Sequence, residues 1–192
     1  TIMHAVFILY TEMDPANGGL AFSEADNGRI FAMIGISGIF TQAVLIGPLT
    51  RRFGSRRLLP FASALAGLGL VLVPYTQAEN AWVQILLVAF LIAVGNGIFQ
   101  PSSSTFLTRV AKANGYELGV VMGAQESLGA FARILGPLTG GLVWTLTVSK
   151  AWPFDYHTAF HLCGLVMLIA SIMALRLPSL DENDSYSSSA EE

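Results

Sequence analysis

The chain has 192 residues, of which 53% are hydrophobic and 12% are charged, and that charged fraction is about half the value usual in soluble domains. So little polar surface cannot enclose a water-soluble globule, and the composition therefore favours a membrane protein. The formal net charge of -3 argues against a nucleic-acid partner, and the single cysteine, Cys163, excludes a disulfide framework within the chain.

Membrane-spanning helices need about 20 mostly apolar residues. Residues 1–10 are apolar, but as a helix they would extend only about 15 Å, which is half a span. The segments that reach full length are 28–49, 58–76, 81–108, 118–146 and 157–175. The sequence thus predicts an all-α, polytopic transmembrane bundle over residues 1–176. The acidic, serine-rich residues 177–192 are predicted to form a disordered cytoplasmic tail.

The alternative to a membrane bundle is a large soluble helical bundle. Buried helices of a large soluble bundle would show a polar face on every turn, and segments 58–76 and 157–175 show almost none.

The half-length first segment has no charged n-region before it, so we expect no signal peptide. Because a natural protein rarely begins inside a membrane helix, we also expect the chain to be part of a longer one.

Positive charge gathers in alternate connections. The segment RRFGSRR at 51–57 holds four arginines, the connection at 109–117 holds Arg109 and Lys112, and Arg176 follows the last apolar segment. The intervening connections are poor in lysine and arginine. The positive-inside rule therefore predicts that the basic connections and the C-terminus lie in the cytoplasm.

Segment 118–146 carries two charges at membrane depth, Glu126 and Arg133. They are seven positions apart, so a helix places them on one face, about 10 Å apart along its axis. Because a charge at the bilayer centre costs about 3 kcal/mol, each must face a cavity or a partner. In one interpretation both line a water-accessible pathway, where Glu126 is a proton site and Arg133 holds an anionic group. In the other they form a structural ion pair or bond to backbone carbonyls.

Three uncharged polar residues also lie within the apolar segments: Gln42, Asn96 and Gln100. They could contact a substrate in the pathway, or they could bond to neighbouring helices at about 0.6 kcal/mol each.

The tetrapeptide GPLT, which occurs at 47–50 and again at 136–139, is either a chance repeat or a helix-kink motif. In the second copy, Gly136 permits close helix approach, and Pro137 lacks the N–H that would bond to the carbonyl of Arg133.

Sites for metals and for catalysis are not expected. The stretch HTAFH places His157 and His161 on one helix face, a spacing that can bind a metal, but no further ligand cluster is visible. There is no nucleophile elbow, zinc-protease motif or phosphate loop, so we expect no cofactor and no enzyme. An intramembrane enzyme that uses the two histidines remains the alternative, and a bound-metal assay would distinguish it.

The first GPLT continues as GPLTRRFGSRR, which resembles the signature loop of the major facilitator superfamily, G-x-x-x-D-R-x-G-R-R. The matching positions are Gly47, Arg52, Gly54 and Arg56. Arg51 stands at the position of the aspartate, and Ser55 stands at that of the first closing arginine. These departures make the weaker copy of the motif, between helices eight and nine of the family, the better match.

The stretches GNGIFQPSSSTFLTRVA and GVVMGAQESLGAFARILGPLTGG look like helices ten and eleven of bacterial drug–proton antiporters, the tetracycline-resistance-like branch of that superfamily. The similar positions are Gly95, Gly97, Pro101, Gly123, Ser127, Arg133, Gly136 and Pro137. Family members commonly carry glutamine at the position of Glu126, so the carboxylate there is a departure from the pattern.

The resemblance covers nearly the whole chain and implies the C-terminal six-helix half of a transporter, from the end of helix seven to helix twelve. It implies a bacterial inner-membrane protein that exports a small molecule or drug in exchange for protons. Its partners would be the substrate, protons, the lipid bilayer and an N-terminal half that is missing here. The alternative is a non-transporting membrane module derived from such a half.

Overall fold

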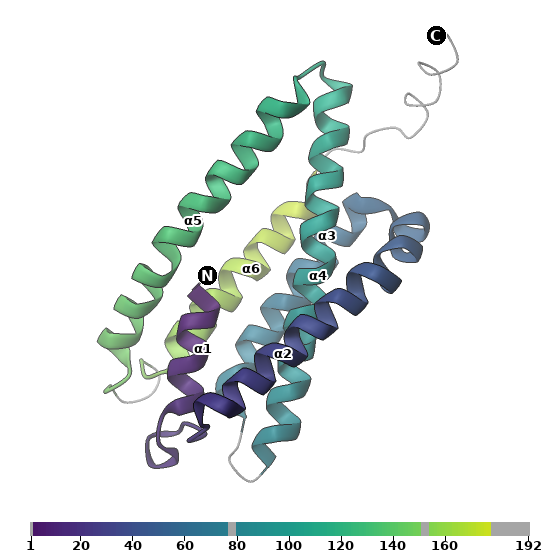
Figure 1. The fold of residues 1–192 in the computed structure, drawn as a ribbon. Helices are drawn as coiled ribbons and strands as arrows, with labels where there is room; N and C mark the ends of the chain where they lie inside the picture. Colours follow the sequence, from purple (N-terminus) through teal and green to yellow (C-terminus); the bar gives the residue numbers. More distant parts are fainter. Residues whose placement is uncertain (1, 77–79, 151–153, 178–192) are drawn as a thin grey trace.

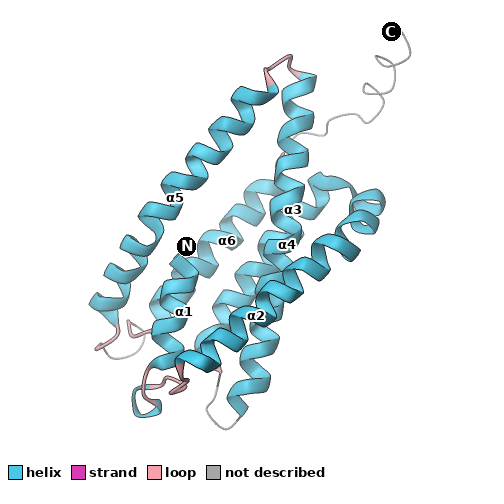
Figure 2. Cartoon of the chain, in the orientation of Figure 1, coloured by secondary structure: helices cyan, strands magenta, loops and turns pink. Residues whose placement is uncertain are grey.

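The computed structural model describes residues 2–76, 80–150 and 154–177, and every regular element in these ranges is a helix (Figures 1 and 2). The predicted all-α fold class is therefore confirmed. The predicted tail, 177–192, lies outside the described residues apart from Leu177. The main helices are α1 (Ile2–Glu12), α2 (Glu24–Phe40), α3 (Ile46–Leu72), α4 (Ala81–Ala113), α5 (Leu118–Thr147) and α6 (His157–Leu175). A 3-10 turn, η1 (Pro15–Asn17), a π-helical turn, η2 (Thr41–Leu45), and a second 3-10 turn, η3 (Val73–Tyr75), lie between them.

Within the described residues, three helical stretches are long and apolar enough to cross a membrane: Glu24–Tyr75, Ala81–Ala113 and His157–Leu175. The first of these contains nearly all of two predicted segments, 28–49 and 58–76. The helix α5 is not among the three, although it has 30 residues. Its glycines and the polar side chains of Gln125, Glu126 and Arg133 lower its hydropathy. It is thus the long helix that most needs a partner other than lipid.

Local signals explain where helices begin and end. Ser23 and Asp26 form a capping box at the start of α2, in which the Asp26 N–H donates to Ser23 Oγ (3.3 Å) and the Ser23 N–H donates to Asp26 Oδ2 (3.1 Å). After α4, Gly115 adopts a φ of 67°, and the Tyr116 N–H donates to the Ala111 carbonyl at 2.9 Å. Glycine suits this left-handed position because it has no Cβ.

The basic segment 51–57 corrects one expectation. We expected a loop between two helices, but the chain is helical on both sides of a single residue, Gly54, whose φ is 73° and ψ is 152°. Only glycine adopts this conformation without strain. One residue therefore interrupts the helix, and the four arginines lie on the helical segments that flank it.

Close helix contacts are made where α3 packs on α4 and α6. A Cβ added to Gly95 of α4 would lie 2.7 Å from the backbone nitrogen of Ala66, and one added to Gly164 of α6 would lie 2.9 Å from the carbonyl oxygen of Gly67. Such contacts require glycine, because any side chain would push the helices apart. They place α3 in the middle of the bundle.

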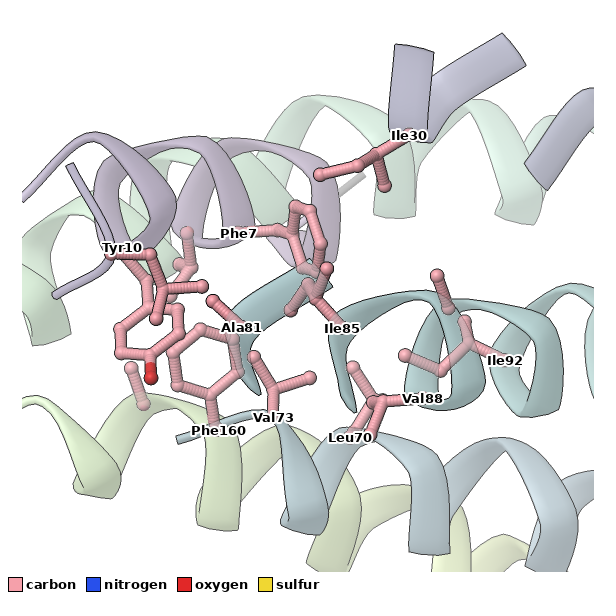
Figure 3. Close-up of a cluster of buried hydrophobic side chains, with 14 of the residues drawn as sticks. Phe7, Tyr10, Ile30, Leu70, Val73, Ala81, Ile85, Val88, Ile92 and Phe160 are labelled. Atoms are coloured by element: carbon pink, nitrogen blue, oxygen red, sulfur yellow. The ribbon is translucent and has the colours of Figure 1, made fainter. Parts of the chain in front are cut away.

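A buried cluster joins the short helix α1 to the rest of the bundle (Figure 3). Phe7 and Tyr10 of α1 are almost fully buried, beside Ile85 of α4 and Phe160 of α6. The rings of Tyr10 and Phe160 meet edge to face with centroids 5.4 Å apart. The Tyr10 hydroxyl donates a hydrogen bond to the Thr76 carbonyl oxygen at 3.1 Å, which satisfies its polar end.

A buried polar network, which the sequence did not reveal, joins α1 to α2. Thr11 is 0% exposed and Asn27 is 4% exposed. The Thr11 hydroxyl donates to Asn27 Oδ1 at 2.7 Å, and Asn27 Nδ2 donates to the Glu12 carboxylate at 3.0 Å. The side chain of Asn27 therefore bridges two residues of α1 and fixes the angle at which the helices meet.

Replacement of Asn27 with alanine is expected to lower the free energy of unfolding by about 1–3 kcal/mol, because it removes both hydrogen bonds within a buried contact. Reversible denaturation of the chain in detergent micelles would measure the loss. The matched control is Asn17→Ala, which removes an exposed side chain from η1. Equal effects of the two substitutions would show that the network contributes nothing.

Candidate functional site

The charges of α5 form an ion pair along one face of the helix. Arg133 Nη2 lies 3.6 Å from Glu126 Oε2. The guanidinium folds back along the helix over Gly129, where an added Cβ would lie 3.5 Å from Arg133 Nη1. The two side chains are 56% and 73% exposed, so within this chain alone they are not shielded. The pair thus lies on an open surface of α5.

The second GPLT lies within α5, and the helix continues through Pro137. The Thr139 hydroxyl donates to the carbonyls of Leu135 (2.9 Å) and Gly136 (3.0 Å), so a side chain supplies hydrogen bonds to the backbone next to the proline. Gly136 is buried, whereas Pro137 is exposed. The missing proline N–H lies one turn beyond Arg133, which leaves the carbonyl of that residue without its usual helical donor.

A polar contact between α4 and α5, which was not predicted from the sequence, lies next to Glu126. Gln125 Nε2 donates to Ser104 Oγ at 3.4 Å, and the Thr108 hydroxyl donates to the Ser104 carbonyl at 2.8 Å. Gln125 Oε1 is buried and has no hydrogen-bond partner. The polar runs QPSSST at 100–105 and QES at 125–127 were the available signal, but which helix they would face could not be read from them.

The remaining predicted pathway residues are exposed on other elements. Asn96 and Gln100 lie on α4, and Gln42 lies in the π-helical turn η2. In the part of the chain that the structure describes, these three make no hydrogen bond to one another or to the charged pair. The turn η2 does lie against α4, because a Cβ added to Gly97 would be 3.0 Å from Thr41 Cγ2. Isolated π-helical turns occur frequently at functional sites, and no sequence pattern indicated this one.

The residues that match the signature loop lie around the break at Gly54. Arg56 Nε donates to the Leu177 carbonyl at 2.8 Å, which joins this region to the end of α6. The guanidinium of Arg52 lies 5.6 Å from the ring centre of Phe53. Gly47 is exposed, and a Cβ added there would meet nothing within 4 Å. The arginine cluster and the end of α6 therefore meet at the same end of the bundle.

An apolar cavity of about 380 Å³ separates α5 from α6 and α3. It is lined by Leu70, Ala132, Thr139, Gly140, Val143, Ala159, Leu162, Cys163, Val166 and Met167. The Thr139 hydroxyl bonds to its own helix, so the lining suits hydrocarbon rather than a polar group. Across residues 2–76, 80–150 and 154–177, no three His, Cys, Asp or Glu side chains are placed to hold a metal ion.

A sequence profile of the Major Facilitator Superfamily matches residues 3–192. The chain belongs to the Major Facilitator Superfamily. It is therefore an integral membrane protein of a transporter family, rather than a member of an enzyme family.

Several curated members of the superfamily resemble the chain. It is 29% identical over 149 residues to Multidrug resistance protein 1 of Bacillus subtilis (strain 168), a match that covers 78% of this chain and 36% of that protein. It is 27% identical over 174 residues to the class G tetracycline resistance protein of Vibrio anguillarum, covering 91% and 40% respectively. The class C tetracycline resistance protein of Escherichia coli is 27% identical over 149 residues, covering 78% and 35%. The chain thus spans between 35% and 40% of the length of these relatives, and no solved structure matches it.

Proposed function

We propose that the chain is the C-terminal six-helix half of a secondary active transporter that exports a small molecule in exchange for protons. The similarity to multidrug and tetracycline resistance proteins supports this activity, and the share of their length that the chain spans supports a partner half. The observation that carries the proposal is the Glu126–Arg133 pair. It lies on the open surface of α5, and α5 falls short of the apolarity of a lipid-facing span.

Exposed charges on a membrane helix need water or protein opposite them. If α5 faced lipid, the pair would be costly to hold there. If α5 faces a central cavity between two halves, the same charges are solvated and accessible to substrate. The exposed polar side chains of Asn96 and Gln100 on α4 and of Gln42 in η2 are assigned to the same cavity. The kink motif at Gly136 and Pro137 would let this part of α5 move.

The pair offers a way to link protons to substrate. Arg133 keeps its proton at any physiological pH, whereas Glu126 can accept one. The separation of 3.6 Å is longer than that of a tight charge-assisted hydrogen bond, so the contact can be exchanged for another. Protonation of Glu126 removes its charge, so a proton and a cationic substrate would compete for this carboxylate beside Arg133. Substrate and proton would then favour different states of the carrier, which is the condition for coupling.

The orientation that we propose follows from the arginines. Arg56 bonds to the carbonyl that follows Arg176, so two basic segments meet at one end of the bundle. The residues that match the signature loop, Gly47, Arg52, Gly54 and Arg56, would lie at that end. By the positive-inside rule this end is cytoplasmic, and the C-terminus lies in the cytoplasm. The membrane would be the bacterial inner membrane.

Transport by reconstituted protein tests the proposal. The chain would be expressed together with the N-terminal half that we propose for the carrier, purified and placed in proteoliposomes. An imposed pH gradient should drive tetracycline or a fluorescent cationic dye against its concentration gradient, and a proton ionophore should abolish the accumulation. Accumulation that is unchanged by the ionophore would refute proton coupling. A native protein that consists of these helices alone and moves no substrate would favour a non-transporting membrane module.

A further inference from the structure

A second group of titratable side chains lies at the end of the bundle where α6 begins. The imidazole of His157 lies 2.8 Å from the carboxylate of Asp155, measured from Nδ1 to Oδ1. One turn later, His161 Nε2 lies 3.1 Å from the hydroxyl of Tyr75 in η3. The rings of His157 and His161 have centroids 5.8 Å apart. None of these residues belongs to the pathway assigned above.

Asp155 has two roles in this group. Its carboxylate accepts a hydrogen bond from the His157 backbone N–H at 3.0 Å, at the residue where α6 begins. The same oxygen meets the imidazole of His157. The side chains of Asp155 and His157 are only 15% and 14% exposed. Their interaction is therefore screened less by water than a surface ion pair would be.

The other titratable groups that face the histidines are tyrosines. Tyr75 stacks on His161 with centroids 5.7 Å apart, and Tyr156 stacks on His157 at 4.3 Å. Tyr10 of α1 stacks in turn on Tyr156 at 5.6 Å. Burial, and to a smaller extent the charge of Asp155, raises the pKa of Tyr156. Because phenols keep their protons near neutral pH, the charge of this cluster is carried by Asp155 and the two histidines.

The cluster contains two imidazoles but only one carboxylate, so a single negative charge faces two groups that can become positive. A first proton on His157 makes an ion pair with Asp155 and leaves the cluster neutral overall. A second proton on His161 places two positive rings next to each other with a single negative charge to balance them. Like charges at this distance disfavour simultaneous protonation, so the two histidines bind protons as a coupled pair.

We propose that Asp155, His157 and His161 form a proton-binding site that holds α6 against η3 and α1 when it carries one proton or none, and loosens that contact when it takes up a second. The site reaches three elements, because Tyr75 belongs to η3 and Tyr156 stacks on Tyr10 of α1. It is separate from Glu126 and does not depend on transport. The end of the bundle opposite the arginine cluster thereby responds to the pH of the compartment that it faces.

Histidine NMR of the full chain in lipid nanodiscs tests the site. The chain contains three histidines, so the variant His4→Gln leaves only the two signals of interest. We expect them to bind protons in two separate steps rather than in one. Replacement of His157 with glutamine should leave His161 with a single step. Amide exchange in η3 and in the first turns of α6 should rise by tenfold or more across the second step, and this rise should be absent in His157→Gln.

The variant Asp155→Asn is the matched charge test, because the amide oxygen of asparagine can accept the same hydrogen bond from the His157 N–H without carrying a charge. It should move the first protonation step to lower pH while the fold is retained. Two histidines that titrate independently at one pH, in both the parent and Asp155→Asn, would overturn the proposal. Two coupled steps without any change in amide exchange would overturn the loosening of α6.

Discussion

Replacement of Glu126 with glutamine in the intact carrier is expected to reduce pH-gradient-driven transport at least tenfold. Glutamine keeps the size and hydrogen-bonding ability of the side chain but cannot bind and release a proton. Exchange of substrate across the membrane without a gradient should continue, because the substrate contacts that we propose for Gln42, Asn96 and Gln100 are left in place. Proteoliposome uptake with and without an imposed pH gradient would measure both quantities.

The matched control for this experiment is Glu117→Gln, the same substitution at an exposed position where α5 begins. It should leave both rates within about twofold of the parent. The folding of Glu126→Gln should be nearly unchanged, because ion pairs as exposed as this one contribute about 0–1 kcal/mol. Undiminished gradient-driven transport in Glu126→Gln would remove Glu126 from the coupling mechanism and leave the pair as a structural contact.

Replacement of Gly95 with valine is expected to lower the free energy of unfolding by about 3 kcal/mol or more, as overpacked helix contacts do. The added Cβ would lie 2.7 Å from the Ala66 nitrogen and 2.9 Å from both the Ala62 carbonyl oxygen and Ala66 Cβ. These atoms belong to the backbone or are Cβ atoms, so none can rotate away. The helices α3 and α4 must therefore separate, and thermal or denaturant unfolding in micelles would show the loss.

Gly35→Val provides the comparison for that measurement. Gly35 lies within α2, is exposed, and would have nothing within 4 Å of an added Cβ. Both variants exchange helical glycine for valine, so intrinsic helix propensity changes equally. A loss at Gly95 no larger than the loss at Gly35 would contradict the close α3–α4 contact.

The Glu126–Arg133 pair shows which structural features helical periodicity can predict and which it cannot. The spacing of Glu126 and Arg133 was sufficient to predict that they share a face, since 3.6 residues per turn is a property of the backbone. Whether that face is covered depends on where α5 lies relative to its neighbours. The structure leaves it open within this chain, and we assign the missing cover to a partner half.

The polar cluster at the start of α6 could not be predicted in the same way. The sequence placed His157 and His161 on one helix face but indicated no partner for either of them. The structure instead gives each of them a partner, and Tyr75 is 86 positions away from His161 in the chain. A pairing over such a distance is made by the packing of α3 on α6, which no local pattern contains.

The sequence by itself determined that this protein is an all-α bundle rich in long apolar helices, and to which family it belongs. Apolar length, caps and turn glycines act locally, so these features can be read residue by residue. The tertiary structure alone decided that Gly54 interrupts the basic segment, that Thr41–Leu45 is a π-helical turn, and that Asn27 bridges α1 and α2. In a membrane helix apolar side chains face both lipid and protein, so hydropathy cannot tell which face is packed. Only the three-dimensional arrangement of the helices supplies that information.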